Sequence, residues 1–117
     1  MTKTLAQLRN RTLQKLKVLG AGEVANAEDA ALVDGAVASV NEKLRDLEIC
    51  YWADGETPES LFEDLAVYVA CHCASDFMSE QEAQAYRQLN EPLSIKEIKR
   101  ITSSRPRAYR AVRQDYF

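Results

Sequence analysis

No apolar run in this sequence approaches the roughly 20 residues that a membrane-spanning helix needs. The first 19 residues also contain no continuous apolar stretch, and their scattered charges are unlike those of a signal peptide. Cysteine is scarce and odd in number, at Cys50, Cys71 and Cys73, which fits a reducing compartment better than a disulfide framework. We therefore expect a protein that is synthesised in the cytoplasm.

Residues that commonly carry catalysis or bind metals are also few. The one histidine, His72, lies in an apolar helical stretch, which favours a buried structural imidazole over a general base. Cys71 and Cys73 are about 200° apart around a helix, so their thiols cannot converge on one zinc ion. Cys50 would need a base that nothing in the sequence specifies, and the acids are too evenly spread to single out a catalytic pair. We predict no catalytic residue, no metal site and no cofactor.

Glycine is scarce as well, but Gly20 and Gly22 stand one residue apart, as in phosphate-binding loops. A dinucleotide-binding fingerprint would need a preceding strand and a third glycine at the position of Ala25, and a Walker loop would need a Lys-Ser or Lys-Thr pair. Gly20 is instead placed to end a helix in the left-handed conformation, and Gly22 frees the chain to reverse. The two glycines therefore predict a hinge between helices.

Apolar residues recur at helical spacing along most of the chain, and no stretch alternates with a period of two. The pattern predicts a first helix ending at Leu19, a second over about 27–47 and a third, central helix over about 58–78. A fourth runs through Ala83, Tyr86 and Leu89 to Pro92, and a short fifth follows it. The predicted helix caps are Asn26, Thr57 (with Pro58 as the first helical residue), Ser79 and Ser94.

These elements predict an all-α protein, a bundle of four to five helices. We expect residues 1–102 to form this helical body and residues 103–117 to form an extended C-terminal segment that becomes ordered on a partner. The residues predicted to form the core are Leu8, Leu44, Leu65, Val69 and Ile98.

Charge is divided into three zones. Residues 1–19 carry five bases and no acid, residues 20–92 carry 16 acids against three bases, and residues 93–117 carry seven bases against two acids. Neither basic end is dense enough in Lys and Arg to dominate nucleic-acid binding. The zones are typical either of contact between oppositely charged patches on different molecules or of solvated helix faces with uneven charge.

The composition changes after Ile101. Residues 103–117 have few aliphatic side chains and cannot build a core of their own. They mix arginine with aromatic residues, as interface hot spots do, and an ordinary frayed terminus is the alternative. The residues predicted to dock on a partner are Arg105, Arg107, Tyr109, Arg110, Arg113, Tyr116 and Phe117.

About the first 50 residues resemble the tail accessory factor, or head-to-tail adaptor, family of tailed bacteriophages. In that family an amphipathic helix ends in a Gly-Ala-Gly-Glu-like corner, and small residues with an acidic pair then begin a long second helix. Lys17 departs from the pattern by its charge. The positions that carry the resemblance are Leu16, Leu19, Gly20, Ala21, Gly22, Glu23, Ala27, Glu28, Asp29 and Ala30.

The resemblance implies a structural protein of the virion head–tail junction that binds the portal protein through a C-terminal extension. It implies a homo-oligomeric ring, twelvefold in the family, that extends the DNA channel, contacts tail proteins and helps to retain packaged DNA. Neither sequence-specific DNA binding nor membrane contact is implied. The alternative is a small helical regulator that binds protein or DNA, but the acidic start of the second helix argues against a basic recognition helix.

Overall fold

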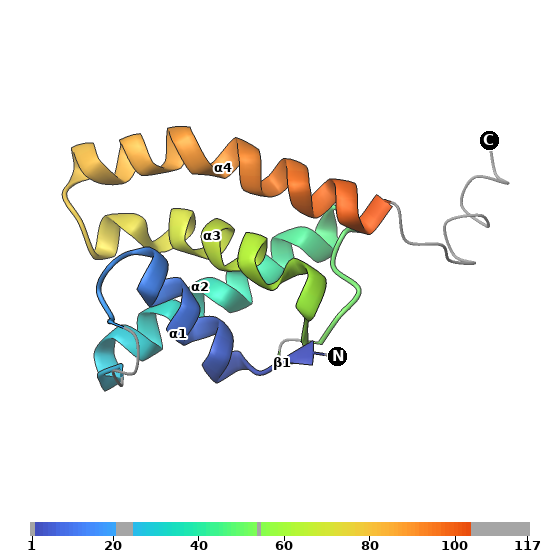
Figure 1. Ribbon diagram of the computed structural model, residues 1–117, viewed down its shortest axis with the longest axis horizontal. Helices are drawn as coiled ribbons and strands as arrows, with labels where there is room; N and C mark the ends of the chain where they lie inside the picture. Colours follow the sequence, from blue (N-terminus) through green and yellow to red (C-terminus); the bar gives the residue numbers. More distant parts are fainter. Residues whose placement is uncertain (1, 21–24, 54, 104–117) are drawn as a thin grey trace, which may run out of the picture.

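The computed structural model describes residues 2–20, 25–53 and 55–103, which are mostly helical (Figure 1). This confirms the helical prediction at the level of fold class. In chain order the elements are β1 (Thr2–Lys3), α1 (Leu5–Lys15), α2 (Ala27–Asp46), β2 (Thr57–Pro58), η1 (Glu59–Leu61), α3 (Phe62–Cys73), η2 (Ala74–Asp76) and α4 (Glu80–Ser103), where η marks a 3₁₀ turn.

The third helix, α3, lies at the centre of the structure. Helices α1 and α2 pack on one side of it and α4 on the other (Figure 1). A helix that is apolar around most of its circumference can be stable only when neighbours cover it on several sides. The prediction that this is the most buried helix is confirmed, because most of its residues are buried. The five predicted core residues, Leu8, Leu44, Leu65, Val69 and Ile98, are all fully buried.

Side-chain caps fix the starts of α1 and α2. The backbone N–H of Gln7 donates to the Thr4 hydroxyl at 3.2 Å, and the Thr4 N–H donates to the Gln7 side chain at 2.8 Å, which makes a capping box. Asn26 caps α2 as predicted, accepting from the N–H of Asp29 at 2.8 Å. These bonds satisfy N–H groups that the helices themselves cannot satisfy.

The chain after α2 folds back onto that helix. Trp52 is buried, and its indole Nε1 donates to the side-chain oxygen of Asn41, which is itself fully buried, at 3.3 Å. Arg45 donates to the Trp52 carbonyl at 3.2 Å. A buried indole N–H needs such a partner, so this contact anchors the segment that leads from α2 to α3.

The structure corrects the predicted start of the third helix. Thr57 does not cap a helix: residues 57 and 58 form β2, which pairs antiparallel with β1 so that Thr2 lies opposite Pro58 and Lys3 opposite Thr57. The Thr57 hydroxyl is buried and has no hydrogen-bond partner in the part of the chain that the structure describes. The 3₁₀ turn then begins at Glu59, and α3 itself begins at Phe62. Backbone pairing with β1 has replaced the side-chain cap.

The predicted break at Pro92 is wrong, because α4 continues through it to Ser103. The start is as predicted: the N–H of Glu82 donates to the Ser79 hydroxyl at 3.2 Å. Ser94, predicted to cap a fifth helix, is instead buried within α4, and its hydroxyl donates to the Glu91 carbonyl at 3.0 Å. Proline costs a helix interior about 3 kcal/mol, and we attribute its tolerance here to the packing of α4 along α3 on both sides of Pro92.

Replacing Leu65 with alanine tests the central position of α3. Leu65 is fully buried, so Leu65→Ala should lower the free energy of unfolding by about 2–5 kcal/mol in urea denaturation. Leu89→Ala is the matched control: Leu89 is 69% exposed, so this change should stay within about 0.5 kcal/mol at low protein concentration. Equal effects of the two substitutions would contradict the burial of α3.

Candidate interaction surface

The predicted docking residues lie outside the residues that the structure describes. This applies to Arg105, Arg107, Tyr109, Arg110, Arg113, Tyr116 and Phe117, and to Gly22 of the predicted hinge. Docking through residues 103–117 therefore stays a prediction. The described residues contain the other predicted features, together with one surface that the sequence analysis missed.

The end of α1 differs from the prediction. The helix ends before the predicted Leu19: its last residue is Lys15, its C-cap is Leu16, and Lys17 follows in the left-handed conformation with φ of 63°. The N–H of Lys17 donates to the Gln14 carbonyl and the N–H of Val18 to the Leu13 carbonyl, each at 3.0 Å. This is the hydrogen-bond pattern of a Schellman motif, which ends the helix at Leu16.

A second Schellman motif ends α2. Glu48 has φ of 62°, its N–H donates to the Arg45 carbonyl at 2.9 Å, and the N–H of Ile49 donates to the Leu44 carbonyl at 2.8 Å. Ile49 and Leu44 are both buried, as the hydrophobic contact of this motif requires. Both helix ends therefore place a charged residue where glycine would be least strained.

His72 is not the buried imidazole that was predicted. It is exposed at the end of α3, where its Nδ1 lies 3.0 Å from the Tyr68 carbonyl and its ring meets the Tyr68 ring edge-on at 4.7 Å.

The cysteines are not arranged as nucleophiles or metal ligands. Cys71 and Cys73 are both buried in α3, and burial raises the pKa of each thiol to about 12. Cys50 is half-buried and its thiol contacts the Trp52 carbonyl at 3.4 Å. Among the residues that the structure describes, no three or more His, Cys, Asp or Glu side chains are grouped so that they could hold a metal ion.

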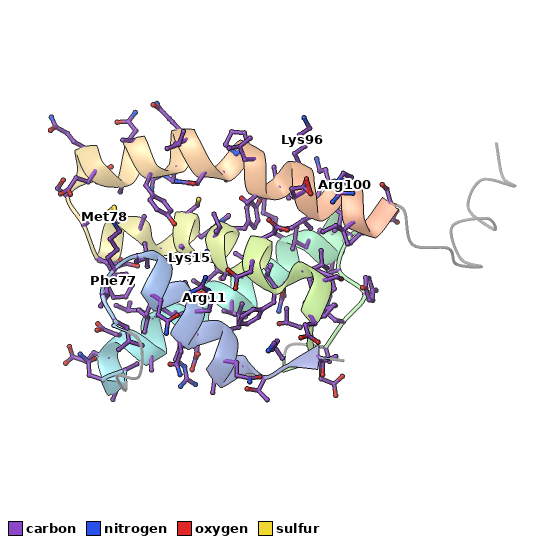
Figure 2. The ribbon with its side chains drawn as sticks, viewed as in Figure 1. Arg11, Lys15, Phe77, Met78, Lys96 and Arg100 are labelled. Atoms are coloured by element: carbon purple, nitrogen blue, oxygen red, sulfur yellow. The ribbon has the colours of Figure 1, made fainter. Side chains whose placement is uncertain are left out.

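Most of the basic side chains of residues 1–19 form ion pairs with acids of the same chain. Arg9 contacts Asp34 of α2 at 2.9 Å, and Lys3 lies 4.0 Å from Glu59. Arg11 and Lys15, which lie close together on α1 (Figure 2), both form ion pairs with Glu63 at the start of α3, at 2.7 and 3.0 Å. Much of the positive charge of residues 1–19 therefore joins α1 to α2 and α3 and is not free to contact another molecule.

The pKa values of Glu63 and of its neighbour Asp64 are shifted in opposite directions. The hydrogen bond from Arg11, with Lys15 adding to it, lowers the pKa of Glu63 to about 2 from its ordinary 4.5. Partial burial raises the pKa of Asp64, and the nearby charge of Glu97 raises it further. Ionised Glu63 therefore stabilises the contact between α1 and α3, whereas ionised Asp64 opposes folding.

An open groove of about 500 Å³ lies between the end of α1 and the first half of α4. Leu16, Met78, Ala85, Tyr86 and Leu89 give it an apolar lining, and Met78 belongs to the turn that joins α3 to α4 (Figure 2). The polar lining residues are Lys15, Lys17, Glu82 and Asn90. Neither His72 nor a cysteine lines this groove.

The outer face of α4 is the surface that the sequence analysis missed. Leu89 is 69% exposed and Leu93 is 62% exposed, one helical turn apart. The predicted fourth helix runs through both Ala83 and Leu89, but six residues are about 240° around a helix, so the two do not share a face. Ala83, Ser94, Ile98 and Thr102 form the buried side of α4 instead. Leu89 therefore joins the apolar lining of the groove to the exposed outer face of α4.

None of the described helices is long and apolar enough to cross a membrane. No model of a protein family matches this chain, and neither does any of the curated proteins or solved structures with which it was compared.

Glycine substitutions test the two left-handed helix ends. Lys17→Gly and Glu48→Gly should each raise the free energy of unfolding by about 0.5–1 kcal/mol, because glycine adopts positive φ without the clash of a Cβ atom. The control is Lys43→Gly in the helical part of α2, where glycine should destabilise by about 1 kcal/mol. Destabilisation by all three changes in thermal melts would refute the assigned conformations.

The pKa shift of Glu63 predicts a pH-dependent stability. Because its folded-state pKa is lowered, its contribution is complete above about pH 4.5 and is lost as the pH falls toward 2. Glu63→Gln should therefore lower the free energy of unfolding at pH 7 by about 0.5–1 kcal/mol, since the carboxylate is half-exposed and screened. The difference from the unmodified protein should disappear near pH 2.

Asp64→Asn provides the matched control at the next position. The raised pKa of Asp64 means that its ionisation opposes folding, so this change should leave stability at pH 7 unchanged or increase it. If both substitutions destabilise equally at pH 7, the ion pairs of α1 with Glu63 do not contribute as described.

Proposed function

We propose that this protein is a structural adaptor that acts by binding other proteins, and that its assembly is a ring at the head–tail junction of a tailed bacteriophage or prophage. The ring lies below the portal protein, extends the DNA channel and helps to retain packaged DNA. The observation that carries the proposal is the resemblance of about the first 50 residues to head-to-tail adaptors.

The structure of that region is compatible with the resemblance. Leu16 and Leu19 are buried at the end of the first helical segment, and a short connection leads to Ala27, where α2 begins. Glu28 and Asp29 lie in the first turn of α2, where negative charge favours the helix dipole. A short amphipathic helix followed in the chain by a longer helix with an acidic start is part of the arrangement that the resemblance implies; the corner residues 21–24 lie outside the described residues.

The chemistry of the described residues also favours a role in binding. The ionisable groups with the largest shifts are a carboxylate held between two bases and two buried thiols, and these are features of packing. The two most exposed of the large apolar side chains in the described residues, Leu89 and Leu93, lie on the outer face of α4, where Leu89 also lines the groove. The acidic composition of residues 20–92 would repel DNA, so DNA could slide through a channel lined by such proteins.

Deleting the C-terminal segment tests how the adaptor would bind the portal. Residues 104–117 follow the last residue of α4, so their removal should leave the thermal melt of the helical body almost unchanged. Binding to the portal protein encoded by the same genome should be lost in co-sedimentation. A full-length variant with Tyr116 and Phe117 changed to alanine should bind more weakly than the unmodified chain.

The full-length protein should decorate the portal as a ring in electron micrographs. Failure of the full-length chain to bind that portal would refute the adaptor function. Unchanged binding after the deletion would refute only the docking role of the C-terminal segment. Sequence-dependent binding to duplex DNA would favour a regulator instead.

A further inference from the structure

The outer face of α4 carries a stripe whose charges and apolar groups are arranged symmetrically. Glu82 and Leu89 are seven residues apart, Leu89 and Leu93 are four apart, and Leu93 and Arg100 are seven apart. Such spacings place all four on one side of a helix. All four are exposed, and we call them the α4 stripe.

From the start to the end of α4, the side chains of the stripe are an acid, two leucines and a base. Residue 91 is the midpoint between the two leucines and also the midpoint between Glu82 and Arg100. The stripe is therefore self-complementary about that point, over a length of about 27 Å. A second copy of α4 turned end for end would place its leucines on these leucines and its base on this acid.

We propose that, in solution, two copies of this protein pair antiparallel through the α4 stripe. In the pair Glu82 faces Arg100 of the partner subunit, and the same contact recurs at the other end of the interface. Leu89 faces Leu93 of the partner subunit, so the four leucines form the apolar centre. The inference describes the free protein and does not depend on the proposed portal-bound ring.

Arg100 and Glu82 each have polar atoms that could take part in the ion pair with the partner subunit. Arg100 uses its Nε for Glu97 of the same helix, at 2.8 and 3.1 Å from the two carboxylate oxygens. Its two terminal amino groups remain for a second acid. The Oε1 of Glu82 contacts the Ser79 hydroxyl at 2.9 Å, which leaves Oε2. Lys96, which projects away from the helices, adds positive charge one turn before Arg100 (Figure 2).

Antiparallel pairing is favoured over the other arrangements of two α4 helices. A parallel pair would place Glu82 beside Glu82 and Arg100 beside Arg100, with like charges at both ends. Antiparallel helices also place opposite ends of their dipoles together. The groove between α1 and α4 is continuous with the stripe, because Glu82 and Leu89 line both, so the partner helix would extend its apolar contact into the groove.

The pairing is isologous, so it closes at two copies. Each subunit uses its stripe once, and no stripe remains for a third copy. Growth of a ring would therefore use other surfaces, and the α4 pair is a separate contact of the unassembled protein.

Charge reversal tests the pairing with the full-length chain. Sedimentation velocity over a range of concentrations should show a monomer–dimer equilibrium for the unmodified protein. Glu82→Arg alone and Arg100→Glu alone should each weaken self-association by about tenfold or more, because each change turns two attracting contacts into repelling ones. Mixed in equal amounts, the two variants should form a heterodimer about as tight as the unmodified dimer, since both contacts are again between opposite charges.

Glu80→Arg is the matched control. It makes the same charge change in the first turn of α4, but position 80 lies about 160° around the helix from Glu82, so self-association should be unchanged. Circular dichroism of each variant confirms that it is folded. An unmodified protein that stays monomeric at all concentrations would overturn the proposal, and so would a mixture that associates no better than its components. Neither result depends on portal binding, so the adaptor function is tested separately by the portal-binding experiment.

Discussion

The need to cover α3 is the constraint on which the rest of the structure depends. This helix has apolar residues around most of its circumference, and water would contact them unless neighbours packed on several sides. Helices α1 and α2 cover one side, and the long α4 covers the other (Figure 1). Schellman motifs end α1 and α2, and the Trp52–Asn41 contact returns the chain after α2 toward the start of α3. These helix ends and the Trp52–Asn41 contact therefore help to hold α1 and α2 against α3.

The same constraint determines which surface remains for partners. Because α4 is an outer layer, only its α3-facing side contributes to the core, and its other side carries Leu89 and Leu93 into solvent. Helix α1 differs, since its bases contact acids of α2 and α3 and are largely used within the molecule. A charge that looks available in the sequence can be neutralised by folding. The outer face of α4 combines apolar side chains with charges that suit a second protein.

Local rules predicted the features that depend on neighbours in sequence. The caps at Asn26 and Ser79 and the five core leucine, valine and isoleucine positions follow from capping chemistry and from helical periodicity. The errors arise where tertiary packing overrides a local preference. Packing on α3 carries α4 through Pro92, and the side of α4 that faces α3 decides the exposure of Leu89. No sequence pattern could indicate that Lys17 would take a left-handed position, because that depends on where the last turn of α1 meets the core.

Helix α3 is the covered centre of the structure, and the outer face of α4 is the surface that we propose a second copy of the protein covers. Hydrogen exchange of the full-length chain, followed at low and high protein concentration, tests both parts together. We expect α3 amides to exchange most slowly, at a rate that does not change with concentration, and α4 amides to exchange more slowly as concentration rises. Exchange in α4 that is independent of concentration, or exchange in α3 as fast as in α4, would contradict the account.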